Sequence, residues 1–397
     1  MTIAGSPGSK ICIVTPEFPP YQWGGLARTA LKASGHARDM GLEVHVAHMT
    51  VADGEVVLLD ENRVTSTFDG ITLHKLSLGR ETIPDGKREL WDCPHNLTLQ
   101  MMFQSIELLH EEERFDLFHS FFLYPVGYVT GLLARRSGRP SVVSIVGNDV
   151  KRYLFSPEKV AVCKSGLDNA DLVVGLSEDL IDLADALTPI KQKARVIYNS
   201  VDIPTESWTP ARNEDAPYRI GCAGIFKYAK GLPYLFKAIL ELSAHHETAL
   251  ELRGHLRPAE KAVFRTMIER TGIRWLVRLD SPLPHERMSG WLQSLDIFVL
   301  PSVSEGCPNV LMEALAAGVP CVATRTGAAE RLIEDGKTGL LVPWGNSKAL
   351  CESIRRLIED PAGAAEMGAA AGTAMAGFSA ERERSEWEGV YRGLLGL

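Results

Sequence analysis

Two glutamates eight positions apart, Glu305 and Glu313, enclose a loop rich in glycine, proline and cysteine within the segment PSVSEGCPNVLMEALAAGVP. An apolar run, 296–300, precedes this loop and predicts a strand, and a helix is expected to begin near Pro308. Free backbone N–H groups at a helix start bind anions such as phosphate. Carboxylates accept hydrogen bonds from sugar and ribose hydroxyls. The segment therefore indicates a site for a phosphorylated, hydroxyl-rich ligand; the alternative is a capped surface helix with incidental acids.

A second candidate loop, GCAGIFKYAKGL, contains Lys227, Lys230 and Gly231 and follows the predicted strand Tyr218–Ala223. Two cations beside a leaving diphosphate would neutralise the charge that develops on it. The loop lacks the GxGxxG pattern, which argues against dinucleotide binding. The alternative for either lysine is a solvated surface side chain.

Other candidates stand where predicted strands end. Gly24 and Gly25 allow the backbone to approach a phosphate or sugar closely, and a helix start follows them; the alternative is a tight turn. His119 ends one apolar run. Asn148 and Asp149 follow another, where they would face an acceptor, and the alternative for Asp149 is a helix cap.

The elements that must position these residues alternate between strand and helix in two series. The first extends from the strand Lys10–Thr15 to Arg195–Tyr198, and the second restarts at Tyr218 after the polar segment Pro204–Pro217. Short, near-continuous apolar strands separated by helices are typical of parallel sheets covered on both faces. We therefore predict two α/β domains, with ligands at the carboxyl ends of their strands.

Composition excludes several classes of protein. The chain has 397 residues and a net charge of −8, which argues against a dedicated nucleic-acid binder. Its seven cysteines form no CxxC pair, so neither a zinc ribbon nor a disulfide framework is expected. The N-terminus lacks a signal-peptide core, and no apolar run approaches the ~18 residues that span a bilayer. We expect a cytoplasmic protein without a cofactor, and since no Asp-x-Asp is present we expect no metal.

The chain resembles the retaining glycosyltransferases of family 4, which have the GT-B fold. The resemblance rests on the E-x7-E pattern from Glu305 to Glu313 and on four further segments in the family's order: EFPPYQWGGLA, IYNSVD, LDIFVLPS and GVPCVATRTGAAERLIEDGKTGLLVPWGN. It implies two Rossmann-like, doubly wound domains facing a central cleft. The first comprises residues 1–203, the second 204–377, and the final helix, 378–397, is expected to pack back on the first.

The resemblance also implies a reaction and its residues. A sugar would move from a nucleotide-diphosphate donor, UDP being the commonest carrier in the family, to an acceptor hydroxyl, giving an α-glycosidic bond. Ile225 stands where the family has a cationic Arg, and Phe121 where it has a second His. His119 matches only the first His, for which a structural role is the alternative. The implied catalytic group comprises Glu305, Lys230, Lys227 and His119. The implied donor-binding group comprises Gly24, Gly25, Gly231, Gly306, Cys307, Pro308, Asn309, Val310 and Glu313, and the acceptor-side residues are Asn148 and Asp149.

Two other functions stay open. A nucleotide-sugar epimerase of the same fold would act on the same donor without an acceptor, and a degenerate relative would bind the nucleotide sugar without turnover. The acceptor, whether a sugar, a lipid-linked glycan or a small molecule, is not specified by the sequence. A monomer or homodimer is expected, and a peripheral contact with the inner face of the membrane is left open.

Overall fold

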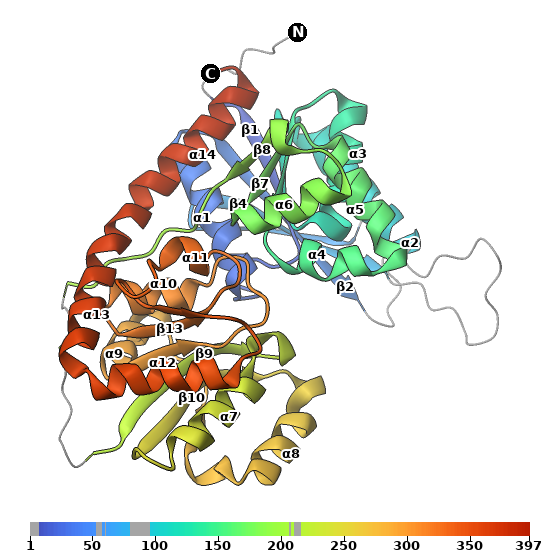
Figure 1. The fold of residues 1–397 in the computed structure, drawn as a ribbon. Coiled ribbons are helices and arrows are strands. Elements are labelled where there is room, and N and C mark those ends of the chain that lie inside the picture. The colour runs from blue at the N-terminus through green and yellow to red at the C-terminus, as the bar shows by residue number, and fades with distance from the viewer. Residues whose placement is uncertain (1–7, 53–57, 60, 80–95, 206–207, 210–215) are drawn as a thin grey trace, which may run out of the picture. The chain divides into compact units, whose positions relative to one another are not determined.

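The computed structural model describes residues 8–52, 58–59, 61–79, 96–205, 208–209 and 216–397. The chain divides into two compact units (Figure 1): unit 1 comprises Met1–Tyr198 with Glu383–Leu397, and unit 2 comprises Asn199–Arg382. The domain boundary predicted between residues 203 and 204 falls a few residues after this division. The polar segment predicted as the linker lies largely outside the described residues.

Unit 1 is built on an eight-stranded sheet with the order β3-β4-β2-β1-β5-β6-β7-β8. Every neighbouring pair is parallel except β3 and β4, which form an antiparallel edge. The order reverses between β1 and β5, so the loops after these two strands diverge at a topological switch point. The strands are β1 Lys10–Thr15, β2 Glu43–Ala52, β3 Arg63–Phe68, β4 Ile71–Gly79, β5 Leu117–Phe121, β6 Ser141–Ile145, β7 Leu172–Gly175 and β8 Ala194–Val196.

Both faces of this sheet are buried, because the alternating side chains of its central strand enter two different apolar clusters. Ile11 and Ile13 of β1 belong to the cluster that includes side chains of α1 (Gly25–Asp39) and α14 (Ala380–Leu395). Cys12 and Val14 belong to the cluster that includes side chains of α2 (Asn96–Glu113) and α3 (Tyr128–Ser137). The remaining helices of unit 1 are α4 Asn148–Lys151, α5 Pro157–Asn169 and α6 Glu178–Leu187.

The C-terminal helix α14 completes unit 1 from the far end of the chain. Trp387 and Tyr391 are 1% and 0% exposed, and their rings stack with centroids 5.6 Å apart. Burial of two such large rings contributes several kcal/mol on the scale of about 25 cal/mol per Å² of apolar surface. The last helix is therefore part of the unit 1 core.

Unit 2 contains a fully parallel six-stranded sheet with the order β11-β10-β9-β12-β13-β14. Its switch point lies between β9 and β12. The strands are β9 Tyr218–Phe226, β10 Thr248–Leu256, β11 Val277–Asp280, β12 Ile297–Leu300, β13 Cys321–Thr324 and β14 Leu340–Val342. The helices are α7 Leu232–Leu242, α8 Lys261–Thr271, α9 His285–Gln293, α10 Asn309–Ala316, α11 Ala329–Leu332, α12 Ser347–Glu359 and α13 Pro361–Met375.

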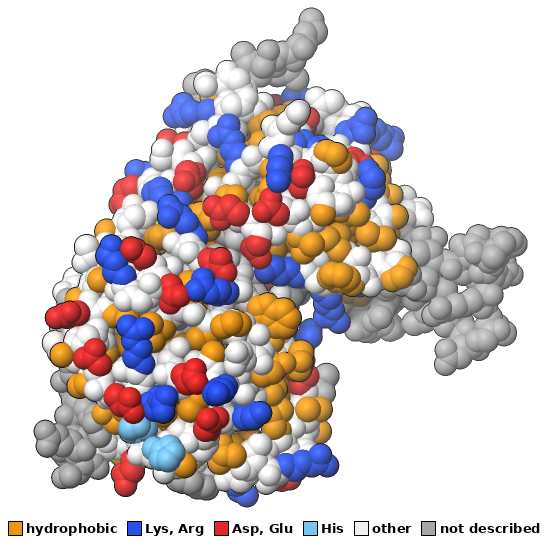
Figure 2. Space-filling view, viewed as in Figure 1, with side chains coloured by type: hydrophobic (Ala, Val, Ile, Leu, Met, Phe, Trp, Pro, Cys, Tyr) orange, Lys and Arg blue, Asp and Glu red, His pale blue; other side chains and the backbone are white. Residues whose placement is uncertain are grey.

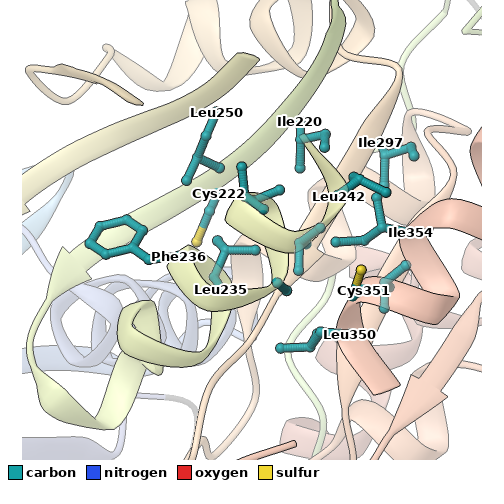
Figure 3. Close-up of a cluster of buried hydrophobic side chains, with 14 of the residues drawn as sticks. Ile220, Cys222, Leu235, Phe236, Leu242, Leu250, Ile297, Leu350, Cys351 and Ile354 are labelled. Carbon is teal, nitrogen blue, oxygen red and sulfur yellow. The ribbon is translucent and has the colours of Figure 1, made fainter. Parts of the chain in front are cut away.

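The core of unit 2 lies between this sheet and the helices α7 and α12. Figure 3 shows Ile220 of β9, Leu235 of α7, Leu250 of β10, Ile297 of β12 and Ile354 of α12 converging on one cluster. All five side chains are at most 2% exposed. The predicted α/β architecture of two doubly wound sheets is thus confirmed. In the part of the chain that the structure describes, no helix combines the length and the apolar character that crossing a lipid bilayer requires.

Candidate functional site

In unit 2 the loops that follow the adjacent strands β9 and β12 are in direct contact. After β9 the chain makes a 3-10 turn, Tyr228–Lys230, and Gly231 then opens α7 with a φ of +66°. A Cβ atom on Gly231 would lie 1.9 Å from the carbonyl oxygen of Pro301, which follows β12. The N–H of Val303 donates to the carbonyl of Ala229 at 2.8 Å. Only glycine fits this contact, which brings the two candidate loops of the sequence together.

The contact places the candidate cation beside the candidate acid. The Lys230 ammonium donates to Oε1 of Glu305 at 2.6 Å, and the Ser302 hydroxyl donates to the same oxygen at 2.6 Å. The side chains of Lys230 and Glu305 are 18% and 11% exposed. An ammonium has three N–H donors, so Lys230 is able to hold Glu305 and an anion together. The pair is thus a partly buried charge site at the switch point of the sheet.

The predicted phosphate-binding turn begins the next helix. Among the residues that the structure describes, no side chain caps the start of α10, where Pro308 is the N-cap residue and Asn309 the first helical residue. On its other side the turn packs against residues that follow β13. Ala328 donates its N–H to the carbonyl of Gly306 at 2.8 Å, and a Cβ on Gly327, whose φ is +58°, would lie 2.3 Å from that same oxygen. The turn is therefore held in a shape that leaves the helix start uncapped by side chains.

The other predicted donor-side residues occupy the same region with less definite contacts. Glu313 and Val310 lie in α10 and are partly buried. Cys307 is half-buried, with its Sγ 3.5 Å from Sδ of Met312. Lys227 is partly buried at the start of the 3-10 turn, whereas Ile225 is 52% exposed.

The predicted glycine loop of unit 1 lies at the start of α1. Gly24 is the N-cap residue, and no side chain in the described part of the chain caps the helix. A Cβ on Gly24 would lie 2.8 Å from Oε2 of Glu17, whereas a Cβ on Gly25 would meet nothing within 4 Å. Because Glu17 is a flexible side chain, space alone does not require glycine here. The loop nevertheless offers an uncapped helix start at the carboxyl end of β1.

His119, predicted among the catalytic residues, lies in the core of unit 1. Its exposed fraction is 0%, with Nδ1 2.9 Å from the Tyr391 hydroxyl and Nε2 2.8 Å from the Ser144 hydroxyl. Burial lowers the pKa of His119 to about 3, so the ring is neutral. Enclosed in this way, the imidazole links β5, β6 and α14.

Asp149, predicted either to face an acceptor or to cap a helix, is also withdrawn from the surface. Its exposed fraction is 0%, and its carboxylate accepts backbone hydrogen bonds from Gly147 at 2.8 Å, Val146 at 3.1 Å, and Leu123 and Val150 at 3.3 Å. Burial raises the pKa of Asp149 to about 6, against the opposing effect of these N–H donors. The carboxylate therefore braces loops. Asn148 begins α4, and its side chain lies outside what the structure describes.

One acid–histidine group of the described residues has the composition of a metal site. Ligand atoms of Glu43, His45 and Glu113 lie within 4.8 Å of one another. The Lys10 ammonium is 3.0 Å from the carboxylate of Glu43 and 2.9 Å from that of Glu113. A cation of the chain itself thus occupies the group, which lies at the amino end of β1 and β2, away from the glycine loop.

Two contacts of the unit 2 site were not predicted from the sequence. Ser302 shares Glu305 with Lys230, and the Asn199 side chain donates to Oδ1 of Asn309 at 2.7 Å. Both residues stand in segments that carried the family resemblance, so their positions, though not their partners, were available in the sequence.

Two family models match the chain, one in each half of the sequence. Residues 23–204 match the family described as Glycosyltransferase Family 4, and residues 217–360 match the family described as Glycosyl transferases group 1. The chain belongs to glycosyltransferase family 4. This glycosyltransferase is 27% identical over 363 residues to the D-inositol 3-phosphate glycosyltransferase of Arthrobacter sp. (strain FB24), covering 86% of this chain and 83% of that protein.

Solved structures share the fold of this glycosyltransferase at low sequence identity. Sucrose-phosphate synthase from Thermosynechococcus elongatus aligns with a TM-score of 0.79 at 18% identity, covering 98% of this chain and 99% of that chain. Anabaena HepE in complex with UDP-glucose aligns with a TM-score of 0.76 at 18% identity, covering 97% and 99%. These likenesses confirm the predicted GT-B fold.

Proposed function

We propose that this glycosyltransferase moves a sugar from a UDP-sugar to an acceptor hydroxyl with retention of the α configuration. The observation that carries the proposal is the Lys230–Glu305 pair, with a 2.6 Å contact at the switch point of the unit 2 sheet. Ligands of open α/β sheets bind at such points. The UDP and UDP-glucose complexes of HepE, a structural neighbour, support UDP as the carrier.

In this proposal Lys230 and the start of α10 bind the donor diphosphate. Negative charge on the diphosphate grows as the glycosidic bond breaks, so a fixed cation stabilises the transition state more than the ground state. Glu305 orients Lys230 and accepts a hydrogen bond from a sugar hydroxyl, and Glu313 accepts one from the ribose. The acceptor attacks from the face that the diphosphate leaves, and the departing phosphate takes the acceptor proton. The burial of His119 is consistent with a reaction that needs no histidine base.

The first experiment incubates the full chain with UDP-glucose radiolabelled in the sugar and with UDP-galactose. The acceptors offered are glucose and D-inositol 3-phosphate, the substrate in the name of the Arthrobacter relative. Release of UDP with labelled sugar in a new α-linked product supports the proposal. Conversion of one UDP-sugar into another would instead identify an epimerase, and UDP-sugar binding without turnover would identify a degenerate binding protein.

We also propose that the reaction needs no metal ion, because Lys230, Lys227 and the helix start offer positive charge to the diphosphate. Activity should survive an excess of EDTA; loss of activity that magnesium or manganese restores would contradict this. Lys227→Ala tests the second cation. A fall in kcat with a smaller change in donor KM is expected, and a wild-type kcat would show that Lys230 acts without it.

A further inference from the structure

An aromatic surface with a lysine lies where β5 and β6 of unit 1 end. The ring of Tyr153 meets the rings of Tyr124 and Phe122 edge-on, with centroids 5.5 Å and 5.9 Å away. The Lys159 ammonium lies 4.3 Å from the centroid of Tyr153 and 5.0 Å from that of Tyr124. The neighbouring Phe155 is 79% exposed. Figure 2 shows hydrophobic side chains gathered over α4 on this face. We call Tyr124, Tyr153 and Lys159 the tyrosine–lysine wall.

Asp149 fastens together the two loops that carry the wall. Its buried carboxylate accepts the N–H of Leu123 from the loop after β5, and those of Val146, Gly147 and Val150 around the loop after β6. The wall residues Tyr124 and Tyr153 lie one residue after Leu123 and three residues after Val150. Hydrogen bonds to a charged acceptor are stronger than neutral ones. One carboxylate thus fixes the spacing of the two tyrosines.

Phe122 adds strain to the first of these loops. Its φ is +92°, a conformation that residues other than glycine rarely adopt. Its N–H donates to the Ser144 carbonyl at 3.0 Å, and its own carbonyl accepts from the N–H of Gly127 at 3.0 Å. Backbone strain of this kind persists only where the surroundings enforce it, and it is concentrated at binding and active sites.

The chemistry of the wall fits a ring with an anionic substituent. Aromatic faces pack against the C–H faces of sugar rings, and a few polar groups around them fix the orientation of a ligand. Among the described acids, none forms an ion pair with Lys159, and its ammonium packs against the two tyrosine rings. An ammonium placed in this way retains N–H donors for an anion. The loops also lie at the carboxyl edge of the sheet, beside its switch point.

We propose that the tyrosine–lysine wall is the acceptor site, that it binds a sugar or cyclic polyol ring carrying an anionic group, and that Asp149 is its positioning residue. The proposal rests on the proposed glycosyl transfer. It assigns the acceptor ring to the aromatic faces and the anionic group to Lys159.

The test measures binding to the full chain in the presence of saturating UDP, by calorimetry or saturation-transfer NMR. The probes are glucose 6-phosphate against glucose, and D-inositol 3-phosphate against myo-inositol. Wild-type protein should bind at least one phosphorylated probe about tenfold or more tightly than its neutral counterpart, and Lys159→Ala should abolish that preference. The matched control is Lys191→Ala, which removes a 63% exposed lysine of the same unit that pairs with Asp182; it should keep the preference.

Equal binding of each phosphorylated and neutral probe, or an unchanged preference in Lys159→Ala, would overturn the proposal. Absence of binding by all four probes to UDP-loaded protein would overturn it as well. Failure of the proposed function looks different, because UDP-glucose would then give no α-linked glycoside with any acceptor, even where the phosphorylated probes bind. The affinity for UDP is also measured on every variant.

Asp149→Asn tests the positioning role, since it weakens the fastening without touching the wall surface. With a transferable acceptor, we expect the acceptor KM to rise on the order of tenfold while kcat at saturating acceptor and the donor KM change little. A parallel fall in kcat with no change in acceptor KM would contradict positioning. If Asp149→Asn does not fold, Tyr153→Ala changes the wall itself and should likewise raise the acceptor KM, and an unchanged acceptor KM would overturn the assignment of the wall.

Discussion

Replacement of Lys230 by alanine tests the unit 2 site through its stability as well as its activity. The variant removes an ammonium that is 2.6 Å from Glu305 and leaves a carboxylate that is 11% exposed and still accepts a hydrogen bond from the Ser302 hydroxyl. Removal of one partner from a buried ion pair costs about 3–5 kcal/mol. Because this pair keeps some exposure and one hydrogen bond, we expect a loss of about 2 kcal/mol. For a unit of this size that corresponds to roughly 4–8 °C in Tm.

The assay is thermal and denaturant unfolding of the full chain, followed with and without UDP. Lys337→Ala is the matched control, because Lys337 pairs with Glu334 at 3.0 Å while both side chains are about two-thirds exposed, at 67% and 65%. Such a surface pair contributes about 0–1 kcal/mol. The double variant Lys230→Ala with Glu305→Ala should recover part of the loss, since it removes the unpaired carboxylate. A Tm shift in Lys230→Ala no larger than in Lys337→Ala would refute the buried-pair argument.

Activity supplies the second half of this prediction. Loss of one preorganised contact to a developing charge lowers turnover by about 10²–10³. We therefore expect kcat of Lys230→Ala to fall by that factor, measured well below its Tm so that the fraction folded is equal to wild type. Wild-type turnover in a folded Lys230→Ala protein would show that the ammonium serves the fold alone.

Three further outcomes follow from the described contacts. Gly231→Ala should destabilise the protein by about 2–4 kcal/mol, because a backbone clash adds to the strain of a positive φ. The control Gly272→Ala, with a φ of +67° and no described atom within 4 Å of the added Cβ, should cost about 1 kcal/mol. Equal unfolding midpoints of the two variants would contradict this. Burial lowers the pKa of His74 to about 4 and that of His119 to about 3 from the ordinary 6.5. The stability that these neutral rings contribute is therefore fully present above pH 6.5 and is lost as the pH falls from 6.5 toward the lowered pKa values. Tm measured from pH 7.5 to 4.5 should therefore fall, and less steeply in His119→Gln. Removal of residues 379–397 takes two buried aromatic rings out of unit 1 and should abolish its cooperative melting, which a chain shortened by its last residue alone should retain.

The fold was predictable where strands are apolar on both faces. The run KICIVT became β1 because its odd and even side chains both enter a core. The hairpin of β3 and β4 was not predicted. β3 has the sequence RVTSTF, and its side chains are exposed except for Phe68, which is half-buried. A polar edge strand buries too little to leave a hydrophobic pattern, and its antiparallel partner is decided by the turn at residues 69–70.

The candidate site was predictable by residue but not by pairing. The spacing of Glu305 and Glu313 and the Lys-Gly loop marked two helix starts. That Lys230 contacts Glu305, 75 residues along the chain, follows from β9 and β12 being neighbours in the sheet, which no local spacing reveals. The burial of His119 did leave a signal. Within β5 it is two residues from both Leu117 and Phe121, so all three side chains lie on the same face of the sheet. Leu117 and Phe121 belong to the apolar cluster that includes side chains of α14.

Acids at the carboxyl edge of a parallel sheet differ in what they bind, and this difference explains why Glu305 and Asp149 could not be told apart from sequence. Loops leaving the sheet have backbone N–H groups that need acceptors, and a short acid four residues beyond a strand, as Asp149 is beyond β6, reaches several of them at once. Asp149 does so, and a ligand could recruit its carboxylate only by unfolding two loops. Glu305 has side-chain donors, Lys230 and Ser302, which are able to turn toward a ligand while the backbone stays in place. Glu305 is therefore able to exchange hydrogen-bond partners during a reaction, whereas Asp149 is not.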